Sequence, residues 1–164
     1  MIRNKIWYEL VNIKYGECYL SKYLGFQRTL SKSFKLITLL LSVSGILGWK
    51  YFEDYAWIAF ILIAIMQLLT LIENTLIRSD KEIEGIAALK MNYTRYFNKL
   101  EQLWTDLQND RLAEDSASDH FFELRKTDWE QIEVLDAQLN IKKYRILMNK
   151  TDIDTTYYLE KYLL

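Results

Sequence analysis

Several residue types that carry chemistry are scarce in this 164-residue chain, which has one cysteine, one histidine, five glycines and no proline. Cys18 has no disulfide partner within the chain, which fits a reducing compartment, and we expect it to be a small packing residue. His120 has neither a second histidine with which to hold a metal ion nor a serine or cysteine nucleophile in a motif around it. The scattered glycines form no phosphate-binding loop. We therefore expect no enzyme, no metal site and no cofactor.

The lack of proline and of any Gly/Ser-rich tract leaves no evident flexible linker, so the chain reads as one helical unit. Its formal net charge is only −1, but the charges are unevenly distributed. The segment before residue 36 is basic, whereas the stretch from Asp110 to Asp136 is rich in carboxylates. Those carboxylates lie on mixed-charge helical faces, where solvation is a simpler explanation than acid-base catalysis. We expect no nucleic-acid partner.

Two long apolar runs, Leu36–Trp49 and Tyr55–Ile72, lie close together and are separated by a short connector rich in aromatic residues. This pattern predicts a transmembrane helical hairpin over residues 34–77, with spans of about 34–52 and 55–77. Seventeen or eighteen helical residues reach roughly 26 Å, just short of a ~30 Å hydrocarbon core. Such short spans favour local membrane thinning or oligomerisation. The alternative is a buried hairpin in a soluble bundle, for which the charged remainder of the chain offers few apolar neighbours.

Basic residues flank the first run much more densely than they occupy the connector, where Lys50 stands alone. By the positive-inside rule both termini are then cytoplasmic, and the chain is a multi-pass protein that contacts membrane lipid, with a bacterial inner membrane as the expected site. The first run begins too far from Met1, and lacks a small-residue cleavage site, for a removable signal peptide.

Residues 1–33 are expected to form an amphipathic cytoplasmic helix. Its apolar stripe alternates spacings of three and four, with Glu17 as the one polar break: Ile6, Leu10, Ile13, Leu20 and Leu24. The stripe could lie in the membrane interface or pack on the other cytoplasmic helices, and packing is the favoured interpretation.

Residues 78–164 are expected to form a cytoplasmic helical region folded as an antiparallel, coiled-coil-like bundle. Ser79 with Glu82, and Thr127 with Glu130, predict two helix starts, with a turn at Glu114 to Asp119 between them. A three-four pattern, with defects at Lys90 and Arg111, predicts one seam: Ile83, Ile86, Tyr93, Phe97, Leu100, Trp104 and Leu107.

The helix after Thr127 is expected to present Ile132, Leu135, Leu139 and Ile146 on one face that folds back on this seam. A last helix from about Thr155 to Leu164 would either pack on the bundle or serve as a partner-binding tail.

This order of elements resembles the SLATT family of two-helix transmembrane effectors, which are associated with nucleotide-synthesising SMODS and nucleotide-sensing SLOG domains. The likeness covers about Trp7 to Leu107 and includes a basic, tyrosine-rich first helix, a tight hairpin, and a long charged helix entered through Leu68 to Asn74. It rests on architecture and residue pattern rather than on an invariant signature.

The resemblance implies a membrane effector of a bacterial antiphage system. Such an effector oligomerises, forms a pore or disrupts the inner membrane, and causes abortive infection when a partner releases it. The trigger would come from a separate sensor or nucleotide-signalling protein. The alternative is a non-conducting membrane adaptor that anchors a cytoplasmic partner, and a channel gated by a small ligand is a third possibility that would need a cytoplasmic pocket.

Polar and small residues within the two apolar runs supply the candidate site. Two helices cannot enclose a pore, so conduction requires a homo-oligomer. The pore-lining candidates fall at helical spacing within each run: Thr38, Ser42 and Gly45 in the first, and Gln67, Thr70, Glu73 and Asn74 in the second. A ring of Glu73 carboxylates would favour cations, and Ser44 with Gly48 would permit close helix approach. Alternatively, Gln67 and Thr70 bond across the hairpin and Glu73 marks the interface.

Overall fold

The computed structural model describes residues 2–51 and 56–163, and the side chains of residues 43–51, 56, 59, 60 and 74 lie outside its description. These described residues are helical with no strand, which confirms the all-α class. The elements follow one another in this order: α1 (Ile2–Tyr51), α2 (Ala56–Leu76), α3 (Asp80–Gln108), α4 (Glu114–Leu124), the π-helical turn η2 (Arg125–Trp129), α5 (Glu130–Leu139) and α6 (Arg145–Tyr162). No helix of the described part combines the length and the apolar character that crossing a membrane requires.

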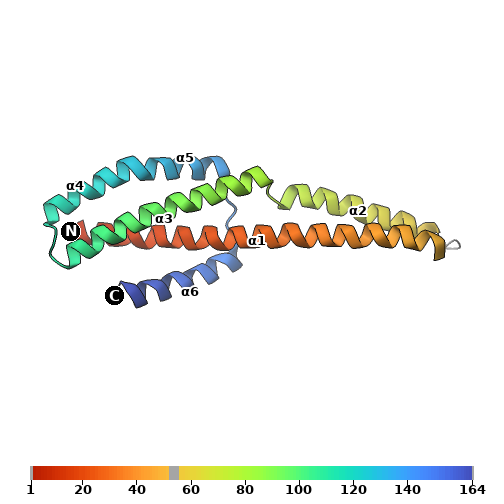
Figure 1. Cartoon of the computed structure of the whole chain (residues 1–164), viewed down its shortest axis with the longest axis horizontal. Coiled ribbons are helices and arrows are strands. Elements are labelled where there is room, and N and C mark those ends of the chain that lie inside the picture. Colours follow the sequence, from red (N-terminus) through yellow and green to blue (C-terminus); the bar gives the residue numbers. More distant parts are fainter. Residues whose placement is uncertain (1, 52–55, 164) are drawn as a thin grey trace. The chain divides into compact units, whose positions relative to one another are not determined.

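The chain divides into two compact units that we describe separately. Unit 1 contains Met1–Leu24 and Lys81–Leu164, and unit 2 contains Gly25–Asp80. The helix α1 contributes its first half to unit 1 and its second half to unit 2. In unit 1 the first half of α1 packs with α3, while α4, η2 and α5 follow α3 and α6 contacts both α1 and α3 (Figure 1).

The predicted stripe of α1 packs on protein in unit 1. Ile6 and Leu10 are fully buried, and Ile13, Leu20 and Leu24 are nearly so. The polar break in the stripe also has partners, because Glu17 accepts hydrogen bonds from the Thr94 hydroxyl at 2.9 Å and the Lys14 ammonium at 3.0 Å. Period and burial therefore agree along this half of the helix.

The predicted seam of α3 lies in the core but is narrower than the buried surface. Ile83 and Tyr93 pack against the core as half-buried side chains. The other five residues of the seam are buried: Ile86, Phe97, Leu100, Trp104 and Leu107. Leu89, Tyr96 and Leu103 are buried as well, outside the predicted pattern. The helix is covered from two sides, since Tyr96 contacts Trp129 at 6.2 Å between ring centroids and Phe97 contacts Tyr158 at 5.7 Å. The three-four pattern of a two-helix seam predicts burial on one side of a helix only, so it did not predict the residues that are buried on the second side of α3.

Three predictions for the last third of the chain were wrong. A helix, α4, begins at Glu114 where a turn was expected, and the turn lies earlier, with Asp110 in the left-handed region at φ 53°. Thr127 does not start a helix, because its hydroxyl donates to the Glu123 carbonyl at 3.0 Å and α4 continues through η2 into α5. That continued helix ends at Leu139, so Ile146 belongs to α6, where it is 73% exposed.

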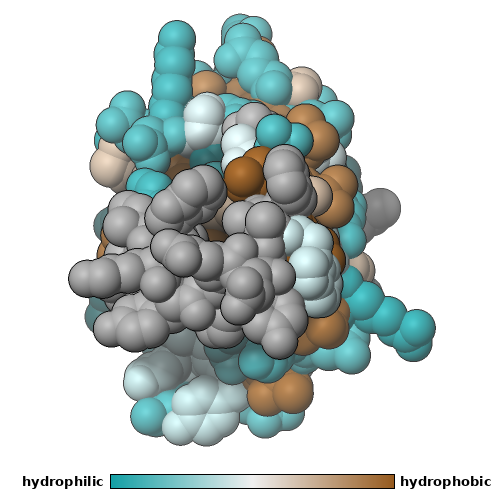
Figure 2. Space-filling view, turned by 90° about the vertical axis from the view of Figure 1, so that its right-hand side faces the viewer, coloured by the Kyte–Doolittle hydropathy of each residue, from teal (hydrophilic) through white to brown (hydrophobic). Residues whose placement is uncertain are grey.

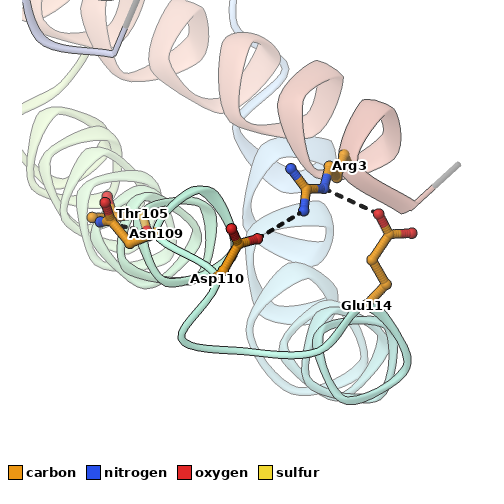
Figure 3. Close-up of polar contacts among 5 residues, drawn as sticks. All are labelled: Arg3, Thr105, Asn109, Asp110 and Glu114. Atoms are coloured by element: carbon orange, nitrogen blue, oxygen red, sulfur yellow. Dashed lines mark hydrogen bonds and ion pairs between the residues drawn. The ribbon is translucent and has the colours of Figure 1, made fainter.

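The seam defect predicted at Arg111 falls beyond α3, which ends at Gln108. The connector that follows is held to the start of α1 by Arg3, which donates to Glu114 at 3.0 Å and to Asp110 at 3.4 Å (Figure 3). The Asp110 side chain is 88% exposed, and those of Arg3 and Glu114 are 40% and 50% exposed, so water screens these ion pairs and they contribute little to stability.

The last helix packs on the bundle, which was one of its two expected placements. It begins ten residues earlier than expected, at Arg145 rather than Thr155. Its inner face buries Thr151, Thr155 and Leu159. Tyr158 donates a hydrogen bond to Glu101 at 2.9 Å, and the Lys14 ammonium lies 3.7 Å from the centre of its ring. Burial, followed by the hydrogen bond to Glu101, raises the pKa of Tyr158 to about 12.

Tyr19 joins α1 to the connector between α5 and α6. Its hydroxyl donates to the Lys142 carbonyl at 2.6 Å and accepts from the Tyr144 amide at 2.9 Å, and the residue is 7% exposed. The pKa of Tyr19 is raised above its ordinary value, chiefly because the side chain is buried.

We expect Tyr19→Phe to lower the free energy of unfolding by about 1–3 kcal/mol, because one hydroxyl leaves two backbone groups without their partner. Chemical denaturation followed by circular dichroism measures the change. Tyr8→Phe is the control, since Tyr8 is 68% exposed and its substitution should be close to neutral. Equal stabilities of the two variants would contradict the role assigned to Tyr19.

Candidate functional site

Unit 2 carries most of the large apolar side chains that the molecule exposes. On the second half of α1 these are Phe26, Leu36, Ile37, Leu39 and Leu40. On α2 they are Trp57, Ile61, Ile63, Ile65, Leu68, Leu71, Ile72 and Leu76. Apolar residues are also visible on the side of the molecule drawn in Figure 2. Exposed apolar side chains in this number, on two helices of one unit, mark a site of contact with protein or lipid.

Unit 2 also lacks an apolar core among its described residues. Gln27 is the only one of them that is buried, with 1% exposure, and it is polar. Its amide nitrogen donates to the Leu76 carbonyl at 3.5 Å, and its oxygen accepts from the Arg78 amide at 3.2 Å. Gln27 thus fixes the end of α2 beside α1, while the apolar residues of both helices remain accessible.

The composition of α2 explains why its apolar residues point in every direction. The helix has 21 residues, and the exposed side chains of Ile61, Ile63, Ile65 and Leu68 lie at spacings of two and three rather than on one stripe. One neighbouring helix can cover only one face of such a surface.

Three of the predicted pore-lining residues of α2 have described side chains. Gln67 and Thr70 are exposed, and Glu73 is half-buried. The Thr70 hydroxyl donates to the Met66 carbonyl at 3.0 Å, so it bonds within α2 and not across the hairpin. Gln67 and Thr70 are three residues apart and share one face of α2, and Glu73 lies beside that face; we call these three residues the polar stripe of α2.

On α1, Thr38 is half-buried and Ser42 is exposed. The Ser42 hydroxyl donates to the Thr38 carbonyl at 2.8 Å, which satisfies it within its own helix and leaves it free to occupy an apolar environment. The side chains of four other predicted site residues lie outside the described set: Ser44, Gly45, Gly48 and Asn74.

Cys18 and His120, whose side chains could act as a nucleophile or a base, both lie in unit 1. Cys18 is a half-buried free thiol, and burial raises its pKa above the ordinary value, against the weaker opposing effects of Thr155 and Lys14. A raised pKa keeps the thiol protonated and unreactive. His120 is exposed on α4. Neither residue shows the environment of an activated nucleophile or base.

Two structural features had no counterpart in the sequence analysis. One is Gln27, a buried polar residue in a segment expected to be a regular basic helix. The other is a cavity of about 540 Å³ in unit 1, lined by residues from α1, α3, η2, α5 and α6. The density of aromatic residues near Tyr15 and Tyr19 was the only sequence signal of it.

Comparison with known proteins adds no assignment, since no family model, curated protein or solved structure matches this chain.

Proposed function

We propose that this chain is a membrane effector of a bacterial defence system, in which unit 2 inserts into the inner membrane as a helical hairpin and assembles into a pore. One observation carries the proposal: apart from Gln27, every described side chain of unit 2 is at least partly exposed, although most of α2 is apolar. The hydrophobic effect disfavours such a surface in water and favours it in lipid or in an oligomer.

The length of α2, taken by itself, fits this placement, although no helix of the described residues also has the apolar character of a spanning segment. The 21 residues of α2 extend for about 31 Å, close to the ~30 Å hydrocarbon core.

In the proposed oligomer, the polar stripe of α2 lines the lumen. In lipid, Gln67 and Glu73 would each carry a cost unless they face protein or water. A closed ring of hairpins provides water for them on its inner side, and a ring of Glu73 carboxylates there favours cations. The Thr70 hydroxyl already has a hydrogen-bond partner in the Met66 carbonyl, so Thr70 can face either the lumen or the lipid.

Regulation would come through unit 1, which would be cytoplasmic by the positive-inside rule if unit 2 spans the membrane. A separate sensor or nucleotide-signalling protein would release the effector by binding one arrangement of this unit better than another. The resemblance to SLATT effectors motivates the defence context and the abortive outcome.

The adaptor hypothesis has one structural observation in its favour. Ile146, Ile153 and Tyr157 lie on the outer face of α6 at 73%, 69% and 61% exposure. Spacings of seven and four place them on one stripe, which could hold a partner. An adaptor would keep its activity when unit 2 is replaced by an unrelated hairpin, whereas a pore-forming effector would lose it.

The test is membrane potential in bacteria that express the full chain, recorded with a voltage-sensitive dye. We expect rapid depolarisation by the wild type, and at least about tenfold slower depolarisation by Gln67→Leu with Glu73→Gln, because the lumen loses its polar lining. Gln138→Leu, on an exposed position of α5, is the matched control and should behave as wild type. Membrane insertion of all variants is checked by fractionation.

Normal potential with a fully inserted wild-type chain, both alone and with its genomic neighbours co-expressed, would overturn the pore. Unchanged ion flux in the double variant would remove Gln67 and Glu73 from the lumen.

A further inference from the structure

The cavity of unit 1 has the size and composition of a small-molecule site. Its volume of about 540 Å³ falls within the range of roughly 300–1,000 Å³ that is typical of such sites. Aromatic and polar side chains line it together: Tyr15, Tyr19, Tyr93 and Trp129 with Asn12, Asp136, Asn140 and Lys143.

Two departures from regular helix and one missing side chain meet at this cavity. Trp129 is the last residue of the π-helical turn η2, a conformation that is rare in proteins and frequent at functional sites. Asn140 ends α5 in the left-handed region, with φ 41°. Gly16 has no side chain where a Cβ would lie 2.3 Å from the Tyr93 ring. Each departure costs stability, and together they shape one space.

The aromatic side chains form a corner. The rings of Tyr93 and Trp129 stand at 76° to each other with centroids 6.4 Å apart. Both residues are half-buried, so part of each ring remains accessible. The two rings make an edge-to-face pair, and the ring faces that remain accessible beside the contact carry negative electrostatic potential, which attracts an organic ammonium group.

Carboxylates add to that negative potential. Asp136 lines the cavity, and its exposed side chain has no hydrogen bond or ion pair to another described residue. Burial, then the charges of Asp136 and Glu9, raises the pKa of Tyr93 to about 12, which places both carboxylates within electrostatic range of the ring. Among the described residues that line the cavity, Lys143 is the one cation. It lies on the exposed α5–α6 connector, where its flexible stem can reach solvent.

We propose that this cavity binds a small organic cation, with the ammonium group in the corner of Tyr93 and Trp129 and opposite the Asp136 carboxylate. The site lies wholly within unit 1, so the proposal does not rest on the membrane function of unit 2. It goes beyond that function by giving unit 1 a ligand class of its own.

Binding of benzyltrimethylammonium to the full chain tests the proposal, measured by isothermal titration calorimetry in mild detergent. Benzyl alcohol and phenylacetate, which share the ring but are neutral and anionic, are the matched probes. We expect saturable 1:1 binding of the cation, at least tenfold tighter than either matched probe.

Two variants locate the binding. Asp136→Asn should weaken binding about three- to tenfold, because one negative charge opposite the cation is lost. Trp129→Phe keeps an aromatic ring but a smaller one, and should weaken binding about threefold because phenylalanine is a poorer cation–π partner. Glu133→Gln, an exposed position on the same helix outside the cavity, makes the same charge change as the first variant and should bind as wild type.

The proposal is overturned if benzyltrimethylammonium does not bind, or if the neutral and anionic probes bind equally well. It is also overturned if Glu133→Gln and Asp136→Asn lose affinity equally, since that would mean general charge attraction. Circular dichroism of each variant checks that the helical content is retained. The binding measurements do not depend on whether the chain conducts ions, so they test this proposal separately from the proposed pore.

Discussion

Gly16→Ala should destabilise unit 1 by about 1–3 kcal/mol, although alanine is the better helix former. The added Cβ would lie 2.3 Å from Cε1 and 2.8 Å from Cδ1 of Tyr93, far closer than van der Waals contact allows. The Tyr93 ring also contacts Trp129, with the ring centroids 6.4 Å apart, so a shift of the Tyr93 ring disturbs its packing against the π-helical turn. The overlap therefore outweighs the propensity gain of about 1 kcal/mol.

Gly25→Ala is the matched control. Gly25 lies in the same helix, and a Cβ at that position meets nothing within 4 Å. Only the propensity term applies there, so this variant should gain up to about 1 kcal/mol. Thermal unfolding of both variants, followed by circular dichroism, gives the comparison. Stabilisation by both substitutions would show that α1 and α3 can separate enough to accept a methyl group at Gly16.

The opposite expected signs at Gly16 and Gly25 show what sequence can and cannot predict. Both are glycines in a helical pattern, and sequence alone gives them the same propensity cost. What distinguishes them is Tyr93, which lies 77 positions along the chain from Gly16 in another helix. Tertiary contacts of this kind decide the packing of a position, but they leave no local pattern.

Periodicity predicted the parts of the fold that one repeating face determines. The buried stripe from Ile6 to Leu24 and the seam from Ile86 to Leu107 follow the helical repeat, so burial along α1 and α3 was accessible from sequence. Leu89 and Tyr96 were missed because α3 is covered from a second side.

Boundaries were predicted less well because the same side chain can serve two roles. A threonine hydroxyl can cap a helix start or bond back to a carbonyl within a helix, and Thr127 does the second. The α5–α6 break depends on Asn140 in the left-handed region and on Tyr19 holding the connector, which lies more than 120 positions from Tyr19 in sequence. The cavity arises from these features together, so no sequence motif predicts it.

Leu68→Arg should remove the chain from the membrane fraction if unit 2 inserts as proposed. Leu68 lies near the middle of α2 and is 59% exposed, so an arginine there disturbs no packing within the hairpin. In water the substitution would be nearly neutral. At the centre of a spanning helix it costs roughly 2.5–3.5 kcal/mol, which is about a 100-fold change in an insertion equilibrium.

Val134→Arg separates the two environments. Val134 is 52% exposed on α5 of unit 1, so both substitutions place the same charge on a similarly accessible apolar residue. Carbonate-washed membranes from cells expressing each variant should retain Val134→Arg as they retain the wild type, and should lose most of Leu68→Arg. Equal retention of the two would mean that the apolar surface of unit 2 is covered by protein, in a second copy or a partner, because only a lipid environment penalises the charge at Leu68 and not at Val134.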